Sequence, residues 1–174
     1  ALQLVGRKAE WQTLLNTWRQ AAQGRAHTVL IEGEAGIGKT RLAEELLDWV
    51  NRQGILNART RSYAAEGALA YAPVIEWLRS PALRPAMARL DPIWRTELAR
   101  LLPELLTEFP NLPRPEPLTE RWQRQRLFET LARAVTVDER PKLLLIDDLQ
   151  WCDQETLEWL RFLAHFASDE PLLV

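Results

Sequence analysis

The feature that most constrains the fold of this chain is a glycine-rich octapeptide between a predicted strand and a predicted helix. It reads Gly33-Glu34-Ala35-Gly36-Ile37-Gly38-Lys39-Thr40 and fits G-x-x-x-x-G-K-[S/T]. The β-branched and apolar run 28–31 before it predicts a buried strand, and the spacing of leucines after it predicts a helix over 40–53. With further strands and helices alternating along the chain, this unit indicates an α/β domain with a mostly parallel sheet.

The composition of this loop suits phosphate binding. Its glycines let the backbone curl so that successive N–H groups point at phosphate oxygens, and the following helix adds its N-terminal dipole. Lys39 is expected to reach the β- and γ-phosphates, and the Thr40 hydroxyl to ligate Mg²⁺. The alternative is a glycine-rich turn that fits the pattern by chance, which the flanking strand and helix disfavour. The candidate nucleotide-binding residues here are Gly33, Glu34, Ala35, Gly36, Ile37, Gly38, Lys39, Thr40 and Arg41.

An apolar run that ends in two carboxylates is the second informative feature. Residues 142–146 predict the strongest strand of the chain, and Asp147 and Asp148 follow it directly. A Mg²⁺-nucleotide site needs a carboxylate opposite Thr40, and Asp147 suits that role. Asp148 would then stand beside the γ-phosphate, where a carboxylate can orient and deprotonate water. The alternative is a strand followed by a solvated acidic turn.

The remaining segments predict one domain over residues 1–174. Helices are expected over 7–23 and over 119–137, the latter with core positions at Trp122, Leu127, Leu131 and Ala134, and Asp153 is expected to cap a further helix. A weaker strand is expected over 55–61. Five of the eleven prolines lie between Pro103 and Pro117, so residues 81–117 predict an insertion of short helices.

Composition excludes several classes of protein. The net charge of −2 gives no overall attraction to nucleic acid or an anionic membrane, and the single Cys152 excludes a disulfide scaffold. The apolar runs are far shorter than the roughly 20 residues of a membrane helix. We expect a cytoplasmic domain cut from a longer protein, with no membrane partner.

Three motifs in order resemble the STAND ATPases, which are allied to the AAA+ group. They are Leu4-Val5-Gly6-Arg7-x-x-Glu10, the octapeptide, and Asp147-Asp148-Leu149-Gln150-Trp151-Cys152-Asp153. The similarity is greatest to ATPase modules of large bacterial LuxR-type and SARP-type transcriptional regulators. It implies a three-layer, ASCE-type P-loop NTPase with Walker A and Walker B motifs, using ATP and Mg²⁺ as a regulatory switch in signal transduction or transcription regulation.

The resemblance also implies roles for individual residues. Val5, Gly6 and Arg7 belong to the adenine side of the site, although Arg7 is equally explained as a surface arginine at a helix start. Lys39 and Asp148 are the candidate catalytic residues. Asp148 is one methylene shorter than the glutamate of many hydrolytic relatives, so slow hydrolysis is expected. The absence of an Asn-Lys-x-Asp motif favours ATP over GTP.

Two other functions stay open from the sequence. One is an AAA+ ATPase of DNA loading or replication initiation, disfavoured by a pI near 5.8; the other is a non-hydrolysing nucleotide-binding scaffold. The resemblance further implies that the strand after Pro171 inserts between the two motif strands. A sensor strand and helical lid are expected beyond Val174, outside this chain. The expected partners are ATP, downstream domains of the same chain, other copies in an ATP-dependent assembly, and DNA only through a domain not in this chain.

Overall fold

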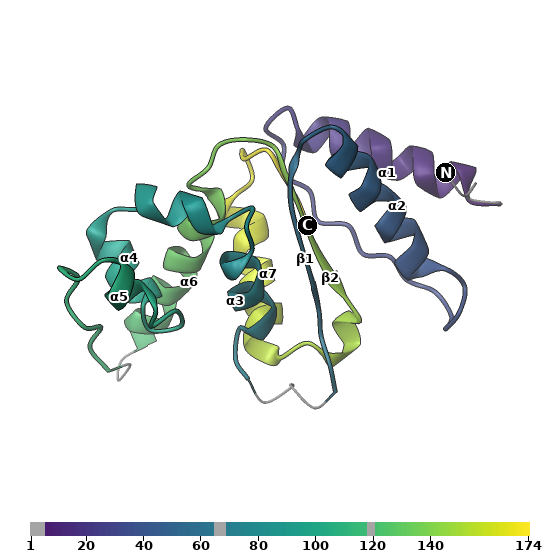
Figure 1. Cartoon of the computed structure of the whole chain (residues 1–174). Helices are drawn as coiled ribbons and strands as arrows, with labels where there is room; N and C mark the ends of the chain where they lie inside the picture. Colours follow the sequence, from purple (N-terminus) through teal and green to yellow (C-terminus); the bar gives the residue numbers. More distant parts are fainter. Residues whose placement is uncertain (1–5, 65–68, 118–120) are drawn as a thin grey trace.

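A parallel sheet organises the domain (Figure 1). The computed structural model describes residues 6–64, 69–117 and 121–174. Strands β1 (Leu56–Arg61), β2 (Lys142–Asp147) and β3 (Leu172–Leu173) lie in the order β1-β2-β3, and both pairings are parallel. His27 forms a parallel bridge to Leu173. The predicted α/β class is therefore confirmed, and β3 lies between β2 and the segment leading to the phosphate loop, as expected.

The strand expected over residues 28–31 is not a regular strand. Three hydrogen bonds join this part of the chain to β3 and the residue after it: His27 N–H to Leu172 O (3.0 Å), Val174 N–H to His27 O (3.0 Å) and Val29 N–H to Val174 O (2.8 Å). Beyond Val29 the backbone up to the glycine-rich loop pairs with no strand in the described part of the chain. The expected burial is also wrong, since Leu30 is 60% exposed. An apolar run does not make a strand without a neighbour along its length.

Helices cover both faces of the sheet because consecutive strand residues point to opposite sides. Leu143 packs in a core with α1 (Lys8–Ala21) and α2 (Lys39–Arg52), whereas Leu144 packs in a second core with α3 (Ala72–Arg79), α6 (Arg121–Thr136) and α7 (Gln154–Phe166). The result is the expected arrangement of three layers (Figure 1).

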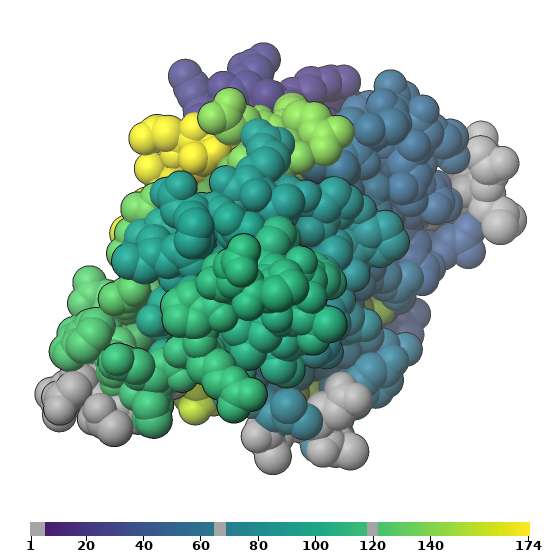
Figure 2. Space-filling model, turned by 60° about the vertical axis from the view of Figure 1, so that its left-hand side comes forward, coloured from purple at the N-terminus to yellow at the C-terminus, as the bar shows by residue number. Residues whose placement is uncertain are grey.

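Residues 81–117 form short helices outside α6, as their prolines require. These are η1 (Arg84–Arg89), α4 (Pro92–Leu98) and α5 (Leu105–Glu108). Leu98, Leu102 and Leu105 are fully buried, so the segment has an apolar interior that joins the core on the α6 side. Figure 2 shows this teal and green segment covering the face turned to the viewer.

The core positions predicted for the helix over 119–137 are right except for one. Leu127, Leu131 and Ala134 are buried in α6, but Trp122 is 57% exposed. Trp122 precedes Leu127 by five positions, which turns it about 140° away from the apolar face. Thr119 lies outside the described residues.

The prediction that Asp153 caps a helix is confirmed, and the same side chain also binds the backbone before α3. It is 5% exposed, and its Oδ1 accepts from Thr156 N–H at 2.8 Å in the first turn of α7. The same oxygen accepts from the backbone N–H of Tyr71 at 3.0 Å, and Oδ2 accepts from the Thr156 hydroxyl at 2.7 Å. Tyr71 directly precedes α3. One buried carboxylate therefore ties the N-termini of α3 and α7 together.

We expect Asp153→Ala to lower the free energy of unfolding by about 2–4 kcal/mol. Loss of a helix cap costs about 1 kcal/mol, and an unsatisfied buried N–H such as that of Tyr71 costs about 1–3 kcal/mol more. Asp153→Asn retains one oxygen acceptor and should cost less. Urea unfolding measures both, with the exposed Asp169→Ala as control. Equal stability of Asp153→Ala and the control would contradict the bridging role.

Candidate functional site

The glycine-rich loop is an exposed turn that leads directly into a helix. Gly36 and Gly38 have φ values of +78° and +94°, a region that side chains disfavour, and no atom lies within 4 Å of a Cβ built on either. The loop therefore needs glycine for its conformation rather than for space. Gly38 stands at the N-cap of α2, so the free N–H groups of the first turn open beside the loop.

Lys39 lies across the loop. Its Nζ donates to the carbonyl oxygens of Gly33 and Glu34, both at 2.9 Å. The ammonium group is thereby positioned inside the turn and next to the N-terminus of α2. A fixed cation and a helix N-terminus at one exposed point both favour an anion.

The two halves of the predicted metal site are in contact. The Thr40 hydroxyl donates to Asp147 Oδ1 at 3.2 Å, and the Asp147 side chain is 13% exposed. Hydroxyl and carboxylate oxygens are ligands of the kind that Mg²⁺ takes, usually few in number and completed by phosphate and water. Over the described residues no group of three or more His, Cys, Asp and Glu side chains could hold a metal ion alone. This donor set therefore fits Mg²⁺ delivered with a nucleotide.

Arg59 is a site residue that the sequence analysis missed. Its Nη2 lies 2.9 Å from Asp147 Oδ2, and its Nη1 lies 2.9 Å from Glu44 Oε1 of α2. Partial burial by itself lowers the pKa of Arg59, but hydrogen bonds to Asp147 and then Glu44 outweigh it, so its pKa is raised. The guanidinium thus bridges the strand end and α2.

Asp148 is held by a second unpredicted arginine on the same strand. Arg61 Nε donates to Asp148 Oδ2 at 2.7 Å, its Nη2 lies 2.6 Å from the same oxygen, and Gln150 Nε2 donates to Oδ1 at 3.2 Å. The hydrogen bond from Arg61 is the main reason that the pKa of Asp148 is lowered. Asp148 also has a left-handed backbone (φ 56°, ψ 45°), a conformation uncommon outside glycine.

One sequence signal points to both arginines. Arg59 and Arg61 are two positions apart, so they share a face of β1, while the intervening Thr60 is buried. The register pairs Arg61 with Asp147. The spacing and both strands were readable from the sequence, but the pairing of β1 with β2 was not.

The other predicted nucleotide-binding residues occupy the rim of the site or lie apart from it. Arg7, just before α1, donates from Nη2 to the carbonyl of Ile37 in the loop at 2.7 Å, and its Nη1 lies 3.6 Å from Glu10. Gly6 adopts a φ of +79° beside it. Arg41 lies along α2, with Nη2 3.8 Å from Glu45. Val5 lies outside the described residues.

This fold and site define a P-loop nucleotide-binding domain. A comparison with protein families agrees: the family described as "AAA ATPase domain" matches residues 3–174. The chain therefore belongs to the AAA ATPase domain family, whose members are nucleotide-binding P-loop ATPases. Searches of curated proteins and of solved structures gave no match. Among the described residues, no helix is both long and apolar enough to cross a membrane.

We expect Arg61→Gln to raise the pKa of Asp148 toward the ordinary value of about 3.9. Asp148 has a lowered pKa in the folded protein, so its stabilising contribution is present above the unfolded value and is lost as pH falls through the folded value. Carboxyl ¹³C NMR titration measures the shift.

Arg79→Gln is the matched control, because Arg79 pairs with Glu104 and holds the pKa of that carboxyl low. It should raise the pKa of Glu104 and leave Asp148 unchanged. An Asp148 titration identical in wild type and Arg61→Gln would show that the ion pair does not persist in solution.

Proposed function

We propose that this domain binds Mg²⁺-ATP at the 33–40 loop and hydrolyses it slowly as a regulatory switch. The observation that carries the proposal is the hydrogen bond between Thr40 and Asp147, from two motifs far apart in the sequence. It joins the first turn of α2, directly after the glycine-rich loop, to the acidic end of β2. The absence of a guanine-type Asn-Lys-x-Asp motif supports ATP as the nucleotide.

In this proposal each part of the site has one task. The loop amides and Lys39 bind the phosphates, and Thr40 and Asp147 hold Mg²⁺, which neutralises phosphate charge when bound. Arg59 can leave Asp147 without losing all its partners, because Glu44 accepts its other nitrogen. The carboxylate that ligates the metal therefore has an exchangeable counter-ion.

Asp148 is the proposed base for the attacking water, and its ion pair with Arg61 supports slow turnover. A carboxylate whose Oδ2 accepts two guanidinium nitrogens is a weakened base. Movement of Arg61 away from Asp148 would make the carboxylate a stronger base. The same ion pair favours a second candidate, a nucleotide-binding scaffold that does not hydrolyse ATP. Turnover measurements on the variants below separate the two.

A switch also needs a contact through which the site affects the rest of the chain. Arg7 supplies one, because it links the start of α1 to the phosphate loop at Ile37. We propose that the domain works in this way within a larger cytoplasmic signalling protein or transcriptional regulator, together with downstream domains and other copies of itself. Any DNA contact would be made by another domain.

We expect Lys39→Ala to weaken Mg²⁺-ATP binding by at least about tenfold. The substitution removes the cation fixed inside the loop, and charge-assisted hydrogen bonds contribute about 1.5–3 kcal/mol each. Isothermal titration calorimetry gives the affinities. Lys8→Ala, which removes a lysine at the start of α1, is the control and should bind as wild type does. Equal affinity of Lys39→Ala and wild type would refute the phosphate-loop assignment.

Replacing the two adjacent aspartates should have different effects. Asp148→Asn keeps the Mg²⁺ ligand and removes the base, so ATP still binds while turnover falls by about 10²-fold or more. Asp147→Asn should instead raise the Mg²⁺ concentration needed for binding. Steady-state phosphate release and Mg²⁺ titrations distinguish them. Turnover of Asp148→Asn at the wild-type rate would remove Asp148 from the mechanism, and no turnover in wild type would favour the scaffold.

A further inference from the structure

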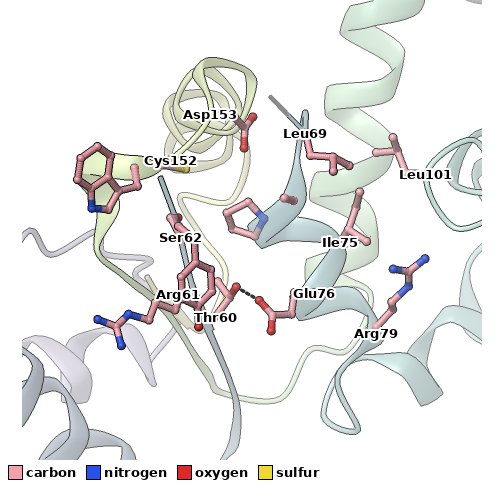
Figure 3. Close-up of a pocket in the computed structure, with 14 residues that line it drawn as sticks. Thr60, Arg61, Ser62, Leu69, Ile75, Glu76, Arg79, Leu101, Cys152 and Asp153 are labelled. Atoms are coloured by element: carbon pink, nitrogen blue, oxygen red, sulfur yellow. Dashed lines mark hydrogen bonds between the residues drawn. The ribbon is translucent and has the colours of Figure 1, made fainter. Parts of the chain in front are cut away.

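A cavity of about 410 Å³ lies at the C-terminal end of β1 (Figure 3). Its walls come from the end of β1 and the residues after it, from α3 and Leu69 before it, from Leu101, and from the loop between β2 and α7. A volume of about 300–1,000 Å³ is usual for small-molecule sites. The glycine-rich loop does not contribute to its lining.

Most of the cavity lining is apolar, and several of its large apolar side chains are exposed to solvent. Tyr63, Leu69 and Trp151 line the cavity and are 51%, 62% and 50% exposed. Figure 3 shows Leu69, Ile75 and Leu101 together on one side of the cavity, opposite Ser62 and Cys152. Exposed aromatic and aliphatic side chains around a hollow favour a ligand with an apolar body.

The charges around the cavity are unequally compensated. Its two arginines already have carboxylate partners, Arg61 in Asp148 and Arg79 in Glu104. Its two carboxylates have no cation within the described ranges. Asp153 is satisfied by the N–H and hydroxyl donors described above, and Glu76 accepts a hydrogen bond from the Thr60 hydroxyl. Glu76 is exposed, whereas Asp153 is buried, so Glu76 presents the accessible uncompensated charge.

We propose that this cavity binds a small organic cation, an ammonium group on an aromatic or aliphatic body, with Glu76 as the residue that recognises the charge. The apolar body packs against Leu69, Ile75 and Leu101, and the ammonium pairs with the Glu76 carboxylate. A partly apolar surrounding strengthens such a pair relative to water. No residue of the glycine-rich loop lines the cavity, and Arg61 is the residue that connects it with Asp148 of the proposed nucleotide site.

The test uses 2-phenylethylammonium as the probe, with neutral 2-phenylethanol and anionic phenylacetate for comparison. ¹H–¹⁵N NMR titration of the ¹⁵N-labelled protein should show saturable shifts at Tyr63, Ile75 and Glu76 and none at residues 33–40. The ammonium should bind more tightly than the alcohol, and phenylacetate least. Glu76→Gln should weaken the ammonium about tenfold and change the alcohol less than about twofold. Glu139→Gln, the same change at an exposed glutamate outside the cavity lining, is the control and should match wild type.

Three results would overturn the proposal: no saturable shifts at the cavity, equal affinities for the three probes, or unchanged ammonium affinity in a folded Glu76→Gln variant. If Glu76→Gln does not fold, the wild-type ranking of the three probes decides. None of these measurements uses ATP. A negative result for the cavity therefore says nothing about the proposed nucleotide site, and a failure to bind ATP says nothing about the cavity.

Discussion

The site depends on the pairing of β2 with neighbours that run in its own direction. Because parallel strands end at one edge of the sheet, the residues that follow them gather there. β1 brings Arg59 and Arg61 beside the end of β2, and β3 separates β2 from the segment that enters the phosphate loop. If β2 and β3 were antiparallel, with the His27 bridge to β3 unchanged, the glycine loop and the acidic residues would lie at opposite edges.

That edge concentrates charge, and the arrangement keeps it balanced. Asp147 and Asp148 face Arg59 and Arg61, while Lys39 is bonded to carbonyl oxygens of the loop. A partly buried charge that loses its only partner is strongly destabilising. A charge with two partners can release one of them and still be paired with the other. Arg59, between Asp147 and Glu44, has this property. A binding site for a charged ligand needs such exchangeable pairs, because the ligand replaces existing partners.

Sequence patterns predicted what is determined locally and missed what depends on neighbours. The loop, the strand at β2 and the Asp153 cap follow from glycine spacing, apolar runs and a capping residue. Trp122 was misplaced because helical phase, rather than apolar character, decides burial. The strand predicted over residues 28–31 was wrong because a strand forms only where a neighbouring strand accepts and donates its backbone hydrogen bonds. Arg59 and Arg61 were missed for the same reason, since their role exists only once β1 is placed against Asp147 and Asp148.

Arg61 belongs to both regions of interest, and the geometry shows why they cannot be independent in structure. Its guanidinium holds Asp148, while the residue also lines the cavity beside β1. The next residue, Ser62, donates its backbone N–H to Asp147 O at 3.0 Å. Trp151, three residues after Asp148, closes the same cavity from the β2 side. A shift of the β1 end therefore changes the cavity wall and the position of Asp148 together, because one short stretch of backbone builds both.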